Sequence, residues 1–199
     1  MYVTQNKNAM IEQLTQLVKQ FGGEAVVNNS AVPNEHNEAV LNNASDSILD
    51  SLKNIATQGG GAELLGSLFK GDAAIDASNP VVQKISEQLT SSLGSKFGLS
   101  SDAASGVAES LIPNVLGSLV GTAKDPANPG FQISDVVGAL TNGDSAVSGE
   151  IMSAISKYGV QFGLDQDGDG QVGISDAVAA VSGKSGGFLN GLLGKFLGK

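Results

Sequence analysis

Residues 79–120 read NPVVQKISEQLTSSLGSKFGLSSDAASGVAESLIPNVLGSLV, and this stretch decides the fold class. Its apolar residues recur with the spacing of one face of an α-helix, and they do not alternate with polar residues as in a half-buried strand. Asn79 and Pro80 are typical of a helix start, since Asn caps free amides and proline has none to lose. Gly98 predicts the end of this helix. We expect its buried face to contain Val81, Val82, Ile85, Leu89, Leu93 and Phe97.

A second helix is expected directly after the first, with Ser101 or Asp102 as its N-cap. Pro113 falls inside this helix, and we expect it to kink or split the helix because proline removes an amide donor and crowds the preceding turn. Gly117 and Gly121 leave two interpretations open, simple interruptions or a close approach of two helices. The predicted core residues are Val107, Leu111, Val115, Leu116 and Leu119.

Helical spacing continues on both sides of this stretch. A first helix is predicted to end in a left-handed cap at Gly22 and Gly23, and a second to run from Pro33 to about Thr57. Short helices are predicted around 63–69, from a cap at Ser134 to Leu140, and over 150–162. The first helix should bury Met10, Ile11, Leu14, Leu17, Val18 and Phe21. The sequence therefore predicts an all-α fold, a multi-helix globular bundle.

Changes in composition divide the chain into four predicted regions. They are an N-terminal helical region at 1–70, a central helical domain at 79–142, an EF-hand-like calcium-binding unit at 147–183 and an amphipathic C-terminal helix at 184–199. The polar segment 71–78 separates the first two. With 41% apolar residues, the chain can bury a sizeable core.

Charge and composition exclude several classes of function. The formal net charge is −9, and all eleven basic residues are lysines. Nucleic-acid-binding proteins rely on clustered Lys and Arg, so we expect no nucleic-acid partner. Cysteine is absent, which excludes disulfides and thiolate metal sites. The N-terminus lacks the pattern of a secretory signal and no apolar run is long enough to span a bilayer, so we expect a cytoplasmic protein without a transmembrane segment.

The segment 165–176, DQDGDGQVGISD, matches the twelve-residue EF-hand loop. Positions one, three and five of such a loop point side-chain oxygens inward, and here they are Asp165, Asp167 and Asp169. Position six requires glycine for a sharp turn, and Gly170 stands there. The alternative is a plain hydrophilic turn, but its four carboxylates would repel one another without a cation. We therefore predict that this loop binds Ca²⁺.

The second half of the loop departs from the usual EF-hand. Gln171 supplies a main-chain carbonyl at position seven, and Asp176 replaces the usual Glu at position twelve, as in dockerin-type loops. Gly173 at position nine leaves room for a coordinating water. EF-hands usually work in pairs, and the sequence shows no second loop. A single loop favours a structural role, or pairing between subunits, over a regulatory switch. The predicted metal ligands are Asp165, Asp167, Asp169, Gln171 and Asp176.

Two groups of segments carry a family resemblance. LIPNVLGSLV at 111–120 and KDPANPGF at 124–131 resemble the YidB-like bacterial family of domains of unknown function, as does the whole stretch 79–140. The opening helix, VVNNSAVPNEHNEAV at 26–40 and the C-terminal loop are similar to the arrangement in its Bacteroidetes members. The resemblance implies a compact, all-helical cytoplasmic protein without an established enzymatic activity, and it supplies no catalytic residues.

The C-terminal segment 185–199, SGGFLNGLLGKFLGK, predicts a small cationic amphipathic helix. Lys195 and Lys199 lie near its apolar face, and no acidic residue is among them. Three interpretations remain open: packing on its own domain, contact with another subunit in a homo-oligomer, and contact with an anionic membrane surface. The apolar face contains Phe188, Leu189, Leu192, Leu193, Phe196 and Leu197.

No catalytic constellation is evident in the sequence. His36 is the only histidine, so it would have to be the proton carrier of any Ser–His–Asp arrangement, and no nucleophile motif accompanies it. We interpret it as a solvated residue at a helix start. The sequence thus predicts a non-enzymatic, calcium-binding structural or interaction protein that self-assembles through its C-terminal helix. The alternatives are a membrane-surface protein and a hydrolase with a calcium-stabilised scaffold.

Overall fold

The structure, a computed structural model, describes residues 2–70, 74–125, 127–128 and 131–159. Over these ranges the chain forms helices joined by turns, with no strand among them, so the all-α fold class is confirmed. The chain divides into two compact units, Met1–Met152 and Ser153–Lys199. The described part of the second unit is the end of the last helix.

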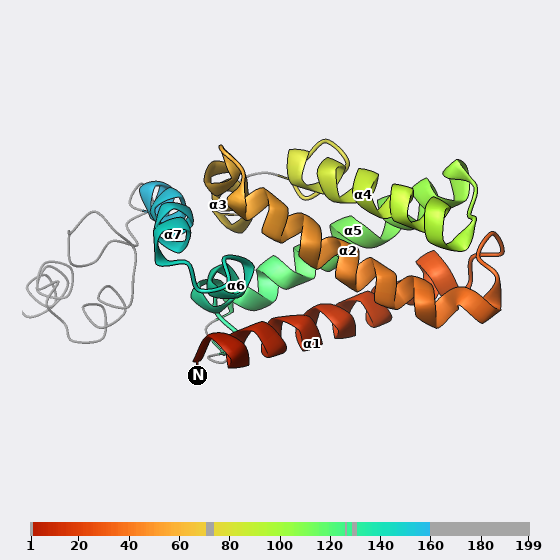
Figure 1. Ribbon diagram of the computed structural model, residues 1–199, viewed down its shortest axis with the longest axis horizontal. Coiled ribbons are helices and arrows are strands. Elements are labelled where there is room, and N and C mark those ends of the chain that lie inside the picture. The colour runs from red at the N-terminus through yellow and green to blue at the C-terminus, as the bar shows by residue number, and fades with distance from the viewer. Residues whose placement is uncertain (1, 71–73, 126, 129–130, 160–199) are drawn as a thin grey trace, which may run out of the picture. The chain divides into compact units, whose positions relative to one another are not determined.

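The helices follow one another with short connections (Figure 1). A π-helical turn at Gly23–Val27 and a 3-10 turn at Asn34–His36 lie between the first two helices. The α-helices are α1 (Tyr2–Gly22), α2 (Asn37–Thr57), α3 (Gly61–Lys70), α4 (Pro80–Phe97), α5 (Ser101–Lys124), α6 (Ile133–Leu140) and α7 (Ser145–Gly159).

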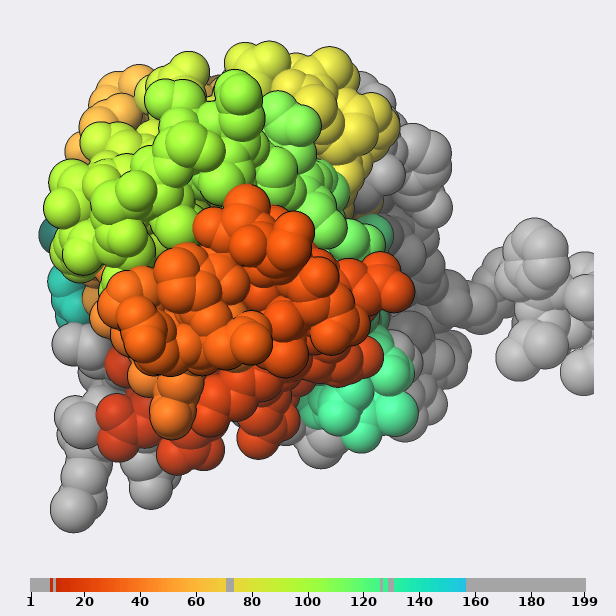
Figure 2. Space-filling model, turned by 90° about the vertical axis from the view of Figure 1, so that its right-hand side faces the viewer, coloured from red at the N-terminus to blue at the C-terminus, as the bar shows by residue number. Residues whose placement is uncertain are grey.

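The core of the first unit forms where the long helices pack together. α4 and α5 make an antiparallel hairpin, α2 packs against α4, and α1 contacts α2, α5 and α6 (Figure 1). Figure 2 shows the first residues of α2 and the turn before it lying against the end of α4. The largest fully buried side chains are Phe69, Met10, Leu14, Ile48, Leu52, Leu65, Leu68, Ile85, Leu89, Leu93, Leu111 and Ile112.

The predicted ends of α4 are confirmed. Asn79 Oδ1 accepts a hydrogen bond from the Val81 amide at 2.9 Å, and Pro80 is the first helical residue. At the other end Gly98 has φ 65° and donates its amide to the Gly94 carbonyl at 3.1 Å. A side chain at Gly98 would be disfavoured because its backbone lies in the left-handed region.

The predicted N-cap of α5 was wrong, and of the two outcomes predicted for Pro113, a kink or a split, the structure excludes the split. Ser100, rather than Ser101 or Asp102, is the N-cap, because its extended backbone lets its hydroxyl accept from the Ala103 amide at 3.3 Å. Pro113 does not split the helix, which continues from Ser101 to Lys124. The carbonyl that loses its donor belongs to Glu109, an exposed residue, so water can replace the missing amide.

The end of α1 also differs from the prediction. Gly22 has φ −73°, which is ordinary helical backbone, and the chain continues into the π-helical turn instead of a left-handed cap. The reason is apolar burial, since this turn places Ala25 and Val26 in the core. Ile11, predicted to be buried, is 36% exposed.

Two further helices start earlier than expected. α6 begins at Ile133, with Gln132 rather than Ser134 at the N-cap, and the Gln132 amide donates to Asp135 Oδ2 at 2.9 Å. α7 begins at Ser145 instead of residue 150, because Asp144 Oδ1 accepts from the amides of the first turn. Residues 160–162 of the predicted helix lie outside the described residues.

The two regions that the sequence separates at 71–78 belong to the same compact unit. α1 lies against α5 and α6, and α2 lies against α4, so the predicted region 1–70 and the predicted domain 79–142 share one core. Across the described ranges, α5 is the helix whose length and composition would allow it to cross a bilayer. Half of its apolar window is buried inside the protein, as in the core helix of a bundle.

Glycines in the described helices differ sharply in the space around them. At Gly61 an added Cβ would overlap the Ile55 carbonyl, which is main chain and cannot rotate away. At Gly117 and Gly121 an added Cβ would meet nothing within 4 Å. The described helices therefore do not use these two glycines for a close approach.

We predict that Gly61→Ala destabilises the protein by about 2 kcal/mol or more, because the α2–α3 connection must shift to remove the overlap. Gly117→Ala is the matched control and should stabilise by about 0.5–1 kcal/mol, since alanine restricts the unfolded chain and favours helix. Urea unfolding followed by circular dichroism measures both. Equal effects of the two substitutions would contradict this packing.

Candidate functional site

The predicted calcium ligands Asp165, Asp167, Asp169, Gln171 and Asp176 all lie in residues 160–199, outside the described residues. The predicted amphipathic helix at 184–199 lies outside them as well. Within the described ranges no group of three or more His, Asp or Glu side chains is placed to hold a metal ion. The structure therefore does not test the predicted metal site. The candidate sites within the described residues are a groove between two helices and several polar contacts.

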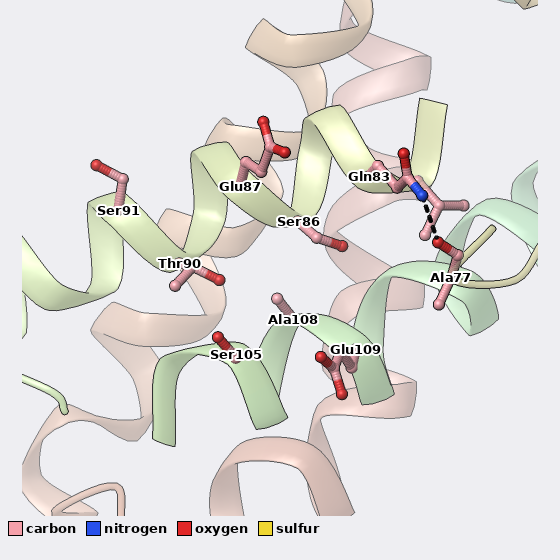
Figure 3. Close-up of a pocket in the computed structure, with 10 residues that line it drawn as sticks. Ala77, Gln83, Ser86, Glu87, Thr90, Ser91, Ser105, Ala108 and Glu109 are labelled. Carbon is pink, nitrogen blue, oxygen red and sulfur yellow. Dashed lines mark hydrogen bonds between the residues drawn. The ribbon is translucent and has the colours of Figure 1, made fainter. Parts of the chain in front are cut away.

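A groove of about 470 Å³ lies along the α4–α5 hairpin (Figure 3). Residues Ser86, Glu87 and Thr90 share one face of α4, because positions three and four apart are neighbours on a helix. Val82 and Ala108 are buried and form its floor. The lining also includes Ala77, Gln83, Ser91, Ser105 and Glu109.

The side chains of the groove point in distinct directions. Figure 3 shows Ser86 and Thr90 of α4 directed toward α5, where Ser105 faces them, while the carboxylate of Glu87 points away from α5 at the rim. At one end Gln83 Nε2 donates to the Ala77 carbonyl at 3.0 Å and fastens the preceding loop to α4.

The chemistry of this groove is that of hydroxyls and carboxylates. Its lining, within the described residues, carries no amine, guanidinium or imidazole. A nucleophilic hydroxyl needs a neighbouring base to take its proton, and the two carboxylates come from different helices without facing one another. The groove is thus suited to holding polar or cationic groups and shows no arrangement for acid–base catalysis.

A capped turn positions the start of α4 beside the groove. Asp76 Oδ1 accepts hydrogen bonds from the Ser78 hydroxyl at 2.6 Å and from the Ser78 amide at 2.8 Å. These bonds favour the charged carboxylate, so they lower the pKa of Asp76 below its ordinary value. Asn79 Nδ2 donates to the Ala74 carbonyl at 3.0 Å and ties the turn together.

A polar seam between α2 and α4 was missed by the sequence analysis. Asn43 is 7% exposed and accepts a hydrogen bond from the Ser92 hydroxyl at 2.9 Å. Ser51 lines a second hollow of about 180 Å³, and its buried hydroxyl has no hydrogen-bond partner among the described residues. The sequence does contain a pattern that predicts this polar face, because Asn43, Ser47 and Ser51 follow one another at intervals of four residues and so lie on one side of a helix. The sequence analysis used only the apolar residues beside them to predict the buried face of this helix.

His36 lies in the 3-10 turn before α2, as the sequence suggested for a helix start. Its ring packs against Phe97 at the end of α4, with ring centroids 5.8 Å apart, and its Nε2 lies 3.9 Å from Glu35 Oε1. The side chain is 40% exposed. These contacts give His36 a packing role between the turn and α4.

The hydrogen bonds at Asp76 predict a pH effect. Because the pKa of Asp76 is lowered in the folded protein, its contribution to stability is present above the ordinary carboxyl pKa and is lost as pH falls through the lowered one. Ser78→Ala should move the pKa of Asp76 back toward its ordinary value, as measured by carboxyl-carbon NMR titration. Ser95→Ala on α4 is the control and should leave it unchanged. An unaltered titration in Ser78→Ala would show that the hydroxyl does not act on Asp76.

Comparison with known proteins gives no family: no protein-family model, no curated protein and no solved structure matches the chain. The resemblance to the YidB-like family stays a prediction from the sequence motifs.

Proposed function

We propose that this chain is a non-enzymatic, calcium-binding structural or interaction protein of the all-α class, in which Ca²⁺ stabilises the C-terminal region. The observation that carries the proposal is the loop sequence at 165–176. Asp165, Asp167 and Asp169 supply side-chain oxygens, Gln171 a main-chain carbonyl, and Asp176 the closing carboxylate. Calcium prefers six to eight such oxygens, and neighbouring carboxylates repel one another unless a cation is bound.

A stabilising role suits this loop better than a switch. Sensor EF-hands act in pairs that open a helix pair when calcium binds. The sequence contains one loop, which closes with the short side chain of Asp176. An ion that binds the folded chain and not the unfolded one stabilises it by mass action. The loop therefore holds its own segment in a folded conformation while calcium is present.

The interaction part of the proposal concerns segment 184–199. This segment carries Lys184, Lys195 and Lys199 and no acidic residue, in a chain whose net charge is −9. An apolar helical face with a local positive charge complements the acidic remainder of a second copy. Self-association through this segment is therefore the interaction that we propose, with packing on its own domain as the alternative, since the same charges complement the acidic remainder of the same chain. The same composition favours a second candidate, binding to an anionic membrane surface.

We predict that Asp165→Asn abolishes calcium binding, because it removes one charged ligand while keeping the shape of the side chain. Calorimetric titration of the full wild-type chain should show one site. At a calcium concentration about a hundred times Kd, the wild type should gain about 2.7 kcal/mol of stability in the transition that includes the loop.

The matched control is Asp50→Asn, which makes the same charge change at an exposed position on α2. It should bind calcium like the wild type. Asp176→Glu should also retain binding, since Glu is the usual ligand at position twelve. A wild-type chain that gives no calcium signal would refute the metal-binding proposal.

We predict that the double substitution Leu189→Ser and Leu193→Ser in the full chain lowers the oligomeric state, because it removes apolar area from the predicted helix face. Size-exclusion chromatography with light scattering measures the molar mass of wild type and variant. Co-sedimentation with anionic and with neutral vesicles separates the membrane alternative. A monomeric wild type that sediments with anionic vesicles would replace self-association by membrane binding.

A further inference from the structure

The turn between α6 and α7 holds an Asn–Gly pair in an unusual conformation. Asn142 has φ 51° and Gly143 has φ 78°, so both residues lie in the left-handed region. Glycine adopts this region readily, and Asn tolerates it better than most residues. Both residues are exposed to solvent.

An Asn followed by Gly can react with its own backbone. The Gly143 nitrogen attacks Cγ of Asn142 and loses its proton to a solvent base, while the Cγ–Nδ2 bond breaks and ammonia leaves. The product is a five-membered succinimide ring. Water then adds to either ring carbonyl and opens the ring, giving aspartate or isoaspartate. Glycine offers no Cβ to hinder the attack, and the step requires only water.

In the folded protein the attacking nitrogen already donates a hydrogen bond. The Gly143 amide donates to the Gly138 carbonyl at 2.9 Å, and the Asp144 amide donates to the Thr141 carbonyl at 3.0 Å. These bonds close the C-terminal end of α6. For Gly143 N to reach Cγ of Asn142, the turn must open and the first bond must break.

A side-chain contact fastens this turn to the next helix. The Thr141 hydroxyl lies 2.6 Å from the Ser148 hydroxyl on α7, and it also donates to the Val137 carbonyl at 2.9 Å. Thr141 is 5% exposed and Ser148 is half-buried, so this contact is partly shielded from water. Opening the turn therefore disturbs a part-buried polar contact as well as the helix end.

We propose that Asn142–Gly143 is a self-modification site that deamidates when the α6–α7 turn opens, and that the hydrogen bonds of Gly143 and Thr141 hold the reaction back in the folded protein. Isoaspartate adds one methylene to the main chain. That extra atom shifts Asp144 from its position as the cap of α7, where it accepts from the amides of Ala146 and Val147. The modification thus loosens the start of α7.

The test measures deamidation of the full chain in mildly alkaline, heavy-oxygen water, with and without urea. Cleavage after lysine gives peptide 125–157, which contains Asn142, and peptide 185–195, which contains the second Asn–Gly pair at Asn190. Mass spectrometry of both peptides reports the incorporated label. In urea the two sites should react at comparable rates. Without urea, Asn142 should react about tenfold more slowly than in urea, because the turn must first open.

Ser148→Ala is the decisive variant, since it removes the contact to Thr141 and leaves residues 141–143 unchanged. It should raise the rate at Asn142 without urea about fivefold, and leave the rate in urea unaltered. Ser95→Ala, which removes an exposed hydroxyl on α4, is the control and should change neither rate. Equal rates with and without urea, or a Ser148→Ala variant that reacts like the wild type, would overturn the proposal.

Discussion

Burial of α5 is the constraint on which the rest of the first unit depends. Along this helix Val107, Leu111, Ile112, Val115 and Leu116 are fully buried, and the helix contacts α1, α3, α4 and α6. Each such side chain contributes about 1.5–3 kcal/mol relative to an exposed one. Pro113 fits within the helix because the carbonyl it deprives of a donor lies on the solvent side. The apolar faces of α1 and α4 are covered in part by packing against α5, while α2 packs on α4 and α1.

The groove and the polar contact described above both lie where α4 packs against α5 and α2. Toward α5, small residues such as Ala104 and Ala108 let the helices pack closely, and hydroxyls and carboxylates line the groove above them. Toward α2, the contact includes the part-buried hydrogen bond between Asn43 and Ser92. An apolar contact tolerates sliding, whereas a buried hydrogen bond stabilises one register. The Asn43–Ser92 bond therefore fixes how α4 sits along α2.

The sequence predicted those parts of the fold that local chemistry controls. The ends of α4 were predicted correctly because Asn79, Pro80 and Gly98 each act within one turn of the helix. The N-caps of α5 and α6 were predicted wrongly because several residues near each helix start can cap. The end of α1 was predicted wrongly because burial of Ala25 and Val26 continues the chain into a π-helical turn. The Asn43–Ser92 bond joins residues 49 positions apart, and no local pattern reports such a pair.

The candidate calcium site shows the opposite case, since its evidence is entirely local. A twelve-residue pattern contains all of its predicted protein ligands, and four of the twenty acidic residues of the chain fall within it. Bringing four carboxylates onto one tight loop is unfavourable in a chain that is already strongly negative. A bound Ca²⁺ offsets two of those charges and replaces repulsion by coordination. In the proposed site the free energy of folding the loop is therefore coupled to the ion, while the core around α5 is held by apolar burial, which does not involve a metal.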